Sequence, residues 1–441
     1  MLKMMKKDLV LYKKNTIKSS KLFKESKKFH VNGVHHNIRF FEPYPFVTKS
    51  SKGKFLVDVD SNKYVDYWMG HWSLILGHSP KNVLHDAKTQ LNNGWMHGTL
   101  SKNTIKLSEK ISKAVPVAEK IRYATTGTEA TMYAVRLART ATRRKIIAKI
   151  DGGWHGYTTD LLKTVNWPFQ KPESRGTADE KHIVSLPYNN LENSIRILKS
   201  ISNDLAGVII EPVLGGGGCI PATKEYLTSI EEFCNKNNSL FILDEIVTGF
   251  RFRYGCLYNT MKLDPDIVTL GKIVGGGFPI GVICGKDEFM KYANTSLFSK
   301  SNRAYIGGGT FSANPLSMIA GDSTLRMIKN KGNMLYERLN RFGSEARKIL
   351  DKKFAGDVIT TGIGSLFLTH FLKGKIIQIK NSTDAAKCNT KKLHDYHFHM
   401  IANDKIFFLP GKLGAISDVH TKSDITAIMK STDNFLTKFK K

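Results

Sequence analysis

Residues 205–245 decide the fold class, and they read LAGVIIEPVLGGGGCIPATKEYLTSIEEFCNKNNSLFILDE. The stretch opens on an apolar run at 205–212 and closes on another at 239–245. Between the two runs, residues 224–238 have the spacing of an amphipathic helix. Near-continuous apolar strands separated by a helix are typical of a parallel sheet that is covered on both faces.

The same alternation continues along the chain, roughly over residues 100–290. Further apolar runs lie at 120–125, 145–150, 266–271 and 280–285. A helical pattern follows the first of these runs, at 129–140. We therefore predict an α/β fold in which helices sandwich a mostly parallel sheet.

The flanking regions have other patterns. Residues 54–68 alternate apolar and polar positions around a turn at 60–62, which indicates short strands. Residues 316–350 have the pattern of a long helix, and we expect 350–441 to form a smaller α+β region. The first 30 residues lack the apolar core of a signal peptide, so we expect a short amphipathic helix or a frayed end, with a transit peptide as the alternative.

The 441-residue chain carries 67 basic and 38 acidic residues, a formal net charge of +29. Such a charge indicates either an anionic macromolecular partner or a general bias toward lysine. The lysines are spread along the whole chain and no nucleic-acid module is recognisable, so we expect no nucleic-acid partner. No run of about 18 apolar residues occurs, so we also expect no membrane span.

The five cysteines are scattered and include no C-x-x-C pair. This usage suits buried thiols in a reducing compartment rather than a disulfide framework or a zinc site. We therefore expect a cytoplasmic protein with unpaired cysteines, which are Cys219, Cys234, Cys256, Cys284 and Cys388.

The reactive residues collect where the apolar runs end. Glu211 follows GVII, Asp244 closes SLFILD, and Lys272 follows DIVTLG. The glycine-containing turn at 125–130 follows IRYA in the same way. In a doubly wound sheet the carboxyl ends of parallel strands share one edge, where ligands bind. We therefore expect these groups to lie together.

The turn at 125–130 reads TTGTEA. Gly127 allows a close backbone approach, and Thr126 and Thr128 offer hydroxyl groups. The helix that follows points its free N–H groups at the same place, which favours a phosphate cradle. The alternative is a plain helix start that Thr128 caps.

Asp244 and Lys272, together with the turn at 125–130, form a set of three groups that could bind one cofactor. A carboxylate at the end of an apolar run needs a partner, such as a protonated ring nitrogen. A metal would need more ligands than the adjacent Glu245, so we expect none, although Asp244 could also be a capping residue. A partly buried Lys272 should have a lowered pKa and could form a Schiff base, whereas the alternative is a surface lysine. Together with the cradle, these groups match the nitrogen, aldehyde and phosphate of pyridoxal 5′-phosphate.

Two neighbouring segments add to this picture. Trp154, in DGGWHGYT, could stack on a cofactor ring, or it could be an ordinary core residue. His155 beside it could contact the ring or orient Asp244. The three glycines at 275–277 plausibly let the chain turn away after Lys272 and leave its amine facing the cofactor.

The chain resembles the class III, fold-type-I aminotransferases that depend on pyridoxal phosphate, and within them glutamate-1-semialdehyde 2,1-aminomutase. The similarity runs from about Leu22 to the C-terminus and implies a large domain over 96–330 with a seven-stranded, mostly parallel sheet. The small α+β domain would comprise 1–95 and 331–441. The motifs that carry the resemblance are DYWMGHWSLILGHSP, TTGTEATMYAVRLAR, GGWHGY, GVIIEPV, LFILDEIVTGFR, TLGKIVGGGFPIG and GGGTFSANPLSMIAG.

The resemblance implies roles for single residues. Lys272 forms the Schiff base with the cofactor and moves protons between substrate carbons, and Asp244 keeps the pyridine nitrogen protonated. The cofactor alternates with its pyridoxamine form. Its phosphate is held by Thr126, Gly127 and Thr128. The ring pocket is formed by Trp154, His155, Glu211 and Ile246.

Two further implications concern the subunits and the substrate. Thr310 reaches the phosphate of the partner subunit, which makes the enzyme a homodimer with its active site at the interface. Arg39 binds the substrate carboxylate, a task that suits a bidentate guanidinium. His36, in the same segment, is a second candidate for binding the substrate.

Two departures from the aminomutase pattern concern the substrate rather than the cofactor. Residues 35–38 read HHNI in place of the usual Asn-Ser-Pro-Val, and FLPGKLGAISDVHT has Lys412 in a region where an acidic residue is usual. The leading prediction is the isomerisation of glutamate 1-semialdehyde to 5-aminolevulinate. The alternatives are an intermolecular aminotransferase, acting on a β- or ω-amino acid or another amine with a 2-oxo acid acceptor, and a basic scaffold without activity.

Overall fold

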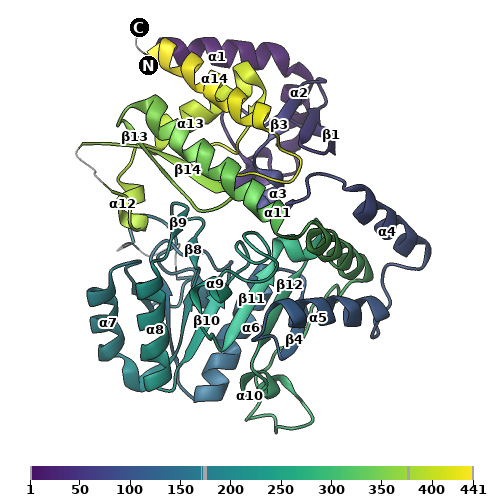
Figure 1. Cartoon of the computed structure of the whole chain (residues 1–441), viewed down its shortest axis with the longest axis vertical. Helices are drawn as coiled ribbons and strands as arrows, with labels where there is room; N and C mark the ends of the chain where they lie inside the picture. Colours follow the sequence, from purple (N-terminus) through teal and green to yellow (C-terminus); the bar gives the residue numbers. More distant parts are fainter. Residues whose placement is uncertain (1, 170, 172–175, 375–377, 440–441) are drawn as a thin grey trace. The chain divides into compact units, whose positions relative to one another are not determined.

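The apolar runs of the sequence form one seven-stranded sheet in a computed structural model that describes residues 2–169, 171, 176–374 and 378–439. The strand order is β4-β12-β11-β10-β7-β5-β6, and Figure 1 labels β4, β12, β11 and β10 of this sheet. The pairings of β10 with β11 and β7, and of β5 with β6 and β7, are parallel, whereas β12 runs antiparallel to β11 and β4. The predicted α/β fold with a mostly parallel sheet is therefore confirmed.

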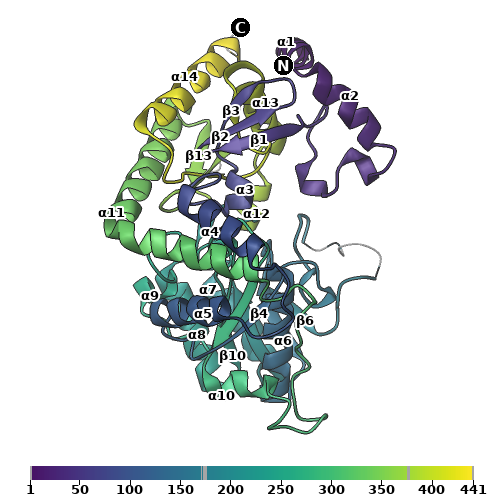
Figure 2. The same ribbon diagram turned by 90° about the vertical axis from the view of Figure 1, so that its right-hand side faces the viewer.

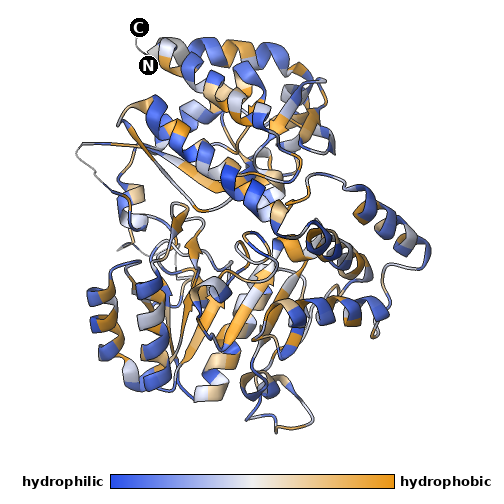
Figure 3. Ribbon diagram, in the orientation of Figure 1, coloured by the Kyte–Doolittle hydropathy of each residue, from blue (hydrophilic) through white to orange (hydrophobic). Residues whose placement is uncertain are grey.

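All six predicted runs become strands, and a seventh joins them. They are β4 (Lys120–Ala124), β5 (Ile146–Ile150), β6 (Ile183–Leu186), β7 (Leu205–Ile210), β10 (Leu240–Asp244), β11 (Ile267–Gly271) and β12 (Gly281–Gly285). Every residue of β7, β10, β11 and β12 is buried, which explains their continuous apolar sequence. Figure 3 shows these strands as mostly hydrophobic, beside helices that alternate in hydropathy.

The connecting helices cover both faces of the sheet. Helix α6 (Gly127–Thr142) connects β4 to β5, and α8 (Lys224–Lys236) connects β7 to β10 in the opposite direction along the sheet. Because such crossovers are right-handed, the two helices lie on opposite faces. Helix α7 (Leu191–Ser200) packs beside α8. The carboxyl ends of the parallel strands lie at one edge of the sheet.

The chain divides into two compact units. The first, which we call the sheet unit, comprises residues 81–336 and 379–386. Besides the sheet, it contains the helices α4 (Lys81–Asn92), α5 (Lys102–Ala114), α9 (Tyr258–Met261), α10 (Asp287–Met290) and α12 (Ser382–Ala386), and the strand pair β8 (Val213–Leu214) and β9 (Ile220–Pro221).

The second, the terminal unit, comprises residues 1–80, 337–378 and 387–441, of which the structure describes the parts given above. Its strands are β1 (Thr48–Lys52), β2 (Phe55–Asp58), β3 (Lys63–Asp66), β13 (Val358–Thr361), β14 (Leu366–Phe371), β15 (Ile406–Phe407) and β16 (Gly414–Ala415). They form a four-stranded and a three-stranded sheet. The helices are α1 (Leu2–Asn15), α2 (Ile17–Ser26), α3 (Met69–Trp72), α13 (Thr390–His399) and α14 (Lys422–Phe439).

Both ends of the chain contribute to the terminal unit (Figure 2). Asp8 of α1 lies 2.8 Å from Nδ1 of His399 in α13, and both side chains are buried. Asn403 also donates to Asp8, at 2.9 Å. These contacts tie the first helix to the C-terminal region, and the N-terminal segment is accordingly helical.

Helix α11 (Pro315–Phe354) corresponds to the long helix predicted over 316–350, but it is not continuous. Gly332 has φ 61° and ψ −156°, a conformation that is essentially reserved for glycine. The helical pattern therefore consists of two segments that meet at this residue.

Two further features of the structure concern the cysteines and the hydropathy of the helices. All five cysteines are buried, and none of them forms a disulfide bond within the described residues. Among the described residues, no helix is long and apolar enough to cross a membrane.

Candidate active site

Asp244 stands at the end of β10, and its carboxylate is buried and held on both oxygens. Oδ1 accepts hydrogen bonds from Thr269 Oγ1 at 3.0 Å and from the N–H of Ile246 at 3.1 Å. Oδ2 lies 2.7 Å from Nδ1 of His155. The side chain is 3% exposed, so its orientation is fixed by these three donors. Of the two roles considered for His155, the structure contains the contact with Asp244.

His155 lies in the loop that follows β5, and its imidazole is fully buried. Thr131 Oγ1 of α6 donates to the carbonyl oxygen of His155 at 2.6 Å, which fixes the backbone. Within the described part of the chain, the Nε2 atom of this ring is buried and has no hydrogen-bond partner. An orphaned polar atom beside a buried carboxylate indicates a place where a further polar group belongs.

Lys272 follows β11 directly. Its φ is +49°, in the left-handed region that non-glycine residues rarely adopt, and strain of this kind is concentrated at functional sites. Part of the residue is accessible to solvent, yet the surrounding protein desolvates its ammonium group. Desolvation lowers the pKa of Lys272 to about 8, against the opposing attraction of Asp244 and Glu211. The amine is therefore much more often neutral near pH 8 than an ordinary lysine.

Two of the three glycines after Lys272 take the left-handed backbone conformations that a tight turn uses. Gly276 and Gly277 have φ values of +59° and +99°. A Cβ atom on Gly276 would lie 2.4 Å from the carbonyl oxygen of Ala320, which leaves no room for a side chain. The positive φ at both positions and the close approach of Ala320 to Gly276 favour glycine in this turn.

Glu211 is the second buried carboxylate near Lys272. Its Oε1 accepts from the N–H of Trp154 at 2.9 Å, and its Oε2 accepts from the N–H of Gly215 at 3.1 Å. Burial raises the pKa of Glu211, and the nearby Asp244 adds to the rise, while His155 opposes it. Glu211 thus anchors the loop of Trp154 to the end of β7.

The predicted phosphate cradle is the start of α6. The helix begins at Gly127, and Thr126 is its N-cap, since Thr126 Oγ1 accepts from the N–H of Glu129 at 3.3 Å. Glu129 returns the contact and completes a capping box. The alternative that made Thr128 the cap is therefore wrong. The N–H groups of Gly127 and Thr128 belong to the first turn of a 16-residue helix, where anions bind.

Close packing around the cradle requires two glycines. A Cβ atom on Gly127 would lie 2.6 Å from Cδ1 of Ile246, which follows Asp244 by two positions. A Cβ atom on Gly156, whose φ is +95°, would lie 2.4 Å from Oγ1 of Thr128. The ends of β4, β5 and β10 therefore meet at this point, as the sequence predicts.

Trp154 and Thr310 are exposed within this unit. Trp154 is 38% exposed and meets Tyr157 edge to face, with ring centroids 4.7 Å apart. Thr310 follows Gly309, where a Cβ atom would lie 3.2 Å from Oε1 of Glu129. The segment of Thr310 thus runs beside the first turn of α6.

Arg39 and His36 belong to the terminal unit. Arg39 ends the short helix η2 (Asn37–Arg39), is exposed, and contacts His35. His36 caps this helix by accepting from the N–H of Ile38 at 3.3 Å, and its ring meets that of His71 edge to face, 5.7 Å apart. Burial, and then the charge of Arg39, lowers the pKa of His36, so its ring is more often neutral.

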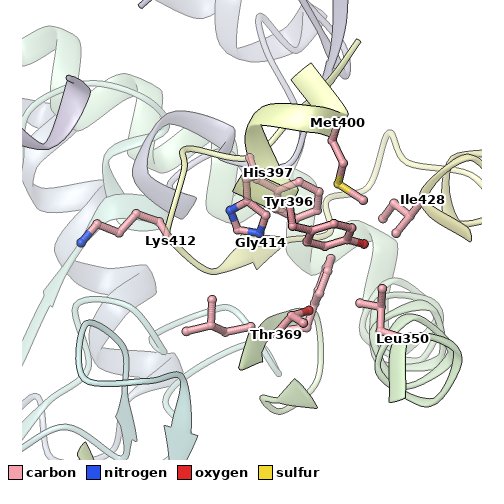
Figure 4. Close-up of a pocket in the computed structure, with 11 residues that line it drawn as sticks. Leu350, Thr369, Tyr396, His397, Met400, Lys412, Gly414 and Ile428 are labelled. Atoms are coloured by element: carbon pink, nitrogen blue, oxygen red, sulfur yellow. The ribbon is translucent and has the colours of Figure 1, made fainter. Parts of the chain in front are cut away.

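Lys412 lies beside a cavity of about 10 Å³ in the terminal unit (Figure 4). The space has the size of a single water molecule. The Lys412 side chain points away from the Tyr396 and His397 rings in this view, and burial lowers its pKa. The cavity is therefore too small to be a substrate site.

Thr269 was not foreseen as a site residue. It pairs with Asp244 across the parallel strands β11 and β10, which brings its hydroxyl to the carboxylate. Aligning the two apolar runs as neighbouring parallel strands would have paired Thr269 with Asp244, because each residue lies near the carboxyl end of its run.

Comparison with known proteins gives a consistent picture. The sequence pattern of the family described as aminotransferase class-III matches residues 40–366. A glutamate-1-semialdehyde 2,1-aminomutase from Thermoplasma volcanium is 36% identical over 93% of this chain and 97% of that protein. One from Methanosphaera stadtmanae is 33% identical over 96% of this chain and 99% of that protein.

Solved structures agree on the fold. A transaminase with PLP bound superimposes with a TM-score of 0.85 at 27% identity, covering 96% of this chain and 99% of the other. A glutamate-1-semialdehyde aminomutase from Pseudomonas aeruginosa gives a TM-score of 0.88 at 17% identity, covering 98% and 97%. A β-phenylalanine aminotransferase from Variovorax paradoxus also gives 0.88, at 24% identity, covering 98% and 97%.

Proposed function

The chain belongs to the class III aminotransferases, and we propose that it is a pyridoxal-phosphate-dependent glutamate-1-semialdehyde 2,1-aminomutase that yields 5-aminolevulinate. The proposal is carried by similarity of more than 30% along almost the whole chain to enzymes with this name. The strand-end cluster around Asp244 and Lys272 supplies groups that suit the chemistry.

The residues of the sheet unit fit pyridoxal phosphate on three sides. The buried, triply hydrogen-bonded carboxylate of Asp244 suits a protonated ring nitrogen. The start of α6, with Thr126, Gly127 and Thr128, suits a phosphate. The low-pKa amine of Lys272 suits an aldehyde. Trp154 and Ile246 would flank the ring, and the orphaned Nε2 of His155 leaves a polar atom free for this site.

When bound, pyridoxal phosphate supplies an aldehyde that condenses with amines and a pyridinium ring that withdraws electrons from the carbon next to the nitrogen. Lys272 Nζ would accept the proton that leaves one substrate carbon and return it to the neighbouring carbon. A pKa of about 8 suits both halves of this task, since the amine can lose and regain a proton at a similar pH.

Asp244 would hold the proton on the ring nitrogen, and His155 would hold Asp244. The contacts of the carboxylate with His155 Nδ1 and with the Thr269 hydroxyl fix its orientation, so that an oxygen atom could face the ring nitrogen. Glu211 would close the ring pocket from the end of β7.

The proposed reaction is an isomerisation and therefore needs no second substrate. An amino group moves from carbon 2 to carbon 1, so substrate and product are isomers and no external amino acceptor is consumed. Arg39 would bind the carboxylate that stays unchanged at the far end of the substrate, with His36 beside it.

We also propose a homodimer, in which Thr310 contacts the cofactor phosphate of the partner subunit. Exposed apolar side chains support an interface, since Tyr305 and Phe311 are 78% and 61% exposed. The side-chain amide of Asn314 donates to the carbonyl oxygen of Trp95 at 3.0 Å, which joins this segment to another exposed aromatic residue. Five buried cysteines without a disulfide bond among the described residues support a reducing location, and we propose the cytoplasm.

One assay separates the aminomutase from an intermolecular aminotransferase. The purified protein, loaded with the cofactor, receives glutamate 1-semialdehyde as the sole substrate. We expect 5-aminolevulinate to accumulate in a one-to-one ratio with substrate consumed. If product forms only when an amine donor and a 2-oxo acid are added, the protein is an intermolecular aminotransferase instead.

A further inference from the structure

A single peptide group in the active-site loop is held between two buried ions. The carbonyl oxygen of Gly153 accepts a hydrogen bond from Nζ of Lys149 at 3.1 Å. The N–H on the other side of the same peptide bond, that of Trp154, donates to Oε1 of Glu211 at 2.9 Å. The dipole of this peptide is therefore aligned between an ammonium and a carboxylate.

Lys149 is unusual because its whole side chain is buried inside β5. Burying an ammonium group is costly unless hydrogen bonds compensate it. Besides Gly153, its Nζ donates to the carbonyl oxygen of Lys163 at 2.6 Å. The ammonium thus links Gly153 and Lys163, two points of the loop that follows β5, and it holds their carbonyl oxygens close together.

The loop carries the residues that the proposed chemistry needs. Trp154 follows the held peptide directly, and His155 comes next, with its Nδ1 2.7 Å from Asp244. Gly152 and Gly156, which flank these residues, have φ values of +77° and +95°. Because glycines give the backbone freedom on both sides, the contacts between them decide where His155 and Trp154 lie.

We propose that Lys149 is a positioning residue for the cofactor, acting through the Gly153–Trp154 peptide together with Glu211. The ammonium sets the orientation of this peptide, and the peptide sets the approach of His155 to Asp244 and the place of Trp154. This inference rests on the proposed pyridoxal-phosphate site and assigns to it a residue that does not touch the cofactor.

Two substitutions test the assignment. Lys149→Met keeps the aliphatic stem and removes the donors. Lys163→Met is the matched control, because the Lys163 ammonium also donates to two carbonyl oxygens, those of Glu180 and Ile183, but not within the segment of Trp154. The dissociation constant of pyridoxal phosphate is measured by equilibrium dialysis, and the visible circular dichroism per bound cofactor reports its orientation.

We expect Lys149→Met to weaken pyridoxal-phosphate binding about tenfold and to change the visible circular dichroism, since a hydrogen bond from a charged donor is lost. We expect Lys163→Met to change binding less than about threefold. Equal binding by wild type and Lys149→Met, or equal losses in both variants, would overturn the proposal. Should Lys149→Met fail to fold, Lys149→Gln, which retains an N–H donor but no charge, is judged by the same two readouts.

A double-mutant cycle separates positioning from a general loss of structure. If Lys149 acts through His155, Lys149→Met should weaken binding much less in a His155→Ala background than in the wild type. Additive losses would count against the proposal. A wild type that binds pyridoxal phosphate but forms no 5-aminolevulinate refutes the proposed function and leaves the role of Lys149 intact, whereas normal binding by Lys149→Met refutes only that role.

Discussion

The strand ends of the sheet unit and the segment 35–39 of the terminal unit hold their functional groups in different ways. Asp244 is buried and receives three donors from β10, β11 and the loop of His155. Arg39 is exposed on a three-residue helix, and its neighbours are histidines. A strand end is fixed by its pairing with two neighbours, whereas a short helix is fixed mainly by its own turn.

This difference suggests a division of labour. The groups proposed for the cofactor lie where a change would disturb the sheet, and the groups proposed for the substrate lie where a change would disturb little else. The departures from the aminomutase pattern, at residues 35–38 and at Lys412, both fall in the terminal unit. Substitutions should therefore affect cofactor chemistry in one unit and substrate affinity in the other.

The largest effect is expected from Lys272→Ala. Removal of the proton-transferring amine should lower the rate of 5-aminolevulinate formation by about 10²–10⁴-fold. The visible absorption of the bound cofactor should also change, because Lys272 is proposed to bond to it. The exposed Lys145→Ala variant should behave as wild type in both measurements. A wild-type spectrum in Lys272→Ala would contradict the assignment.

Asp244→Asn should come next. The amide can keep some of the hydrogen bonds but loses the charge that holds a proton on the ring nitrogen, so the rate should fall by roughly 10²-fold. Glu245→Gln is the matched control, since it removes a neighbouring buried carboxylate whose partners are Thr248 and the N–H groups of Leu257 and Tyr258. Equal rates for the two variants would show that Asp244 has no special role.

Arg39→Ala tests the terminal unit. Loss of a charge-assisted contact of about 1.5–3 kcal/mol should raise KM for glutamate 1-semialdehyde roughly 10–100-fold. The cofactor spectrum should stay unchanged and kcat should change little, because the contact is the same in substrate and transition state. Arg196→Ala, on the exposed face of α7, is the control. A fall in kcat with normal KM would assign Arg39 to the chemistry instead.

The sequence predicts the sheet unit well, and the reason is physical. Buried parallel strands need continuous apolar runs, and polar residues at their ends are conspicuous against that background. Glu211, Asp244 and Lys272 could therefore be placed from sequence. The strand β6 was not singled out from the sequence. This strand is only four residues long and its two middle residues are partly exposed, so its apolar pattern is weak.

Other features needed the three-dimensional arrangement. Lys149 looks like one of many lysines in sequence, and only its burial and its contact with Gly153 set it apart. Thr126 and Thr128 are equally plausible caps until the first helical residue is known. Gly332 lies in an otherwise helical pattern, so the break in α11 is not visible from periodicity.

The pH dependence of Lys272 gives a smaller but more specific effect. Because burial lowers the pKa of Lys272 to about 8, the fraction of neutral, nucleophilic amine rises with pH, reaches about half near pH 8 and predominates above it. In the cofactor-free protein, labelling of Lys272 by an aldehyde followed by reduction should accelerate about tenfold per pH unit below pH 8 and then level off. Lys272→Ala supplies the background, and a rise that continues to pH 10 would contradict the lowered pKa.

The smallest effect is expected from Thr269→Val, which keeps the shape of the side chain and removes one donor to Asp244. The loss of a single hydrogen bond of about 1 kcal/mol should lower kcat about fivefold and leave KM nearly unchanged. The remaining donors, from Ile246 and His155, keep the carboxylate in place. Thr248→Val is the control, because its hydroxyl donates to Glu245 and not to Asp244. If kcat fell as much as in Asp244→Asn, every donor to Asp244 would be needed to hold its carboxylate. The difference between the tightly held strand end and the exposed segment of Arg39 would then be larger than we infer.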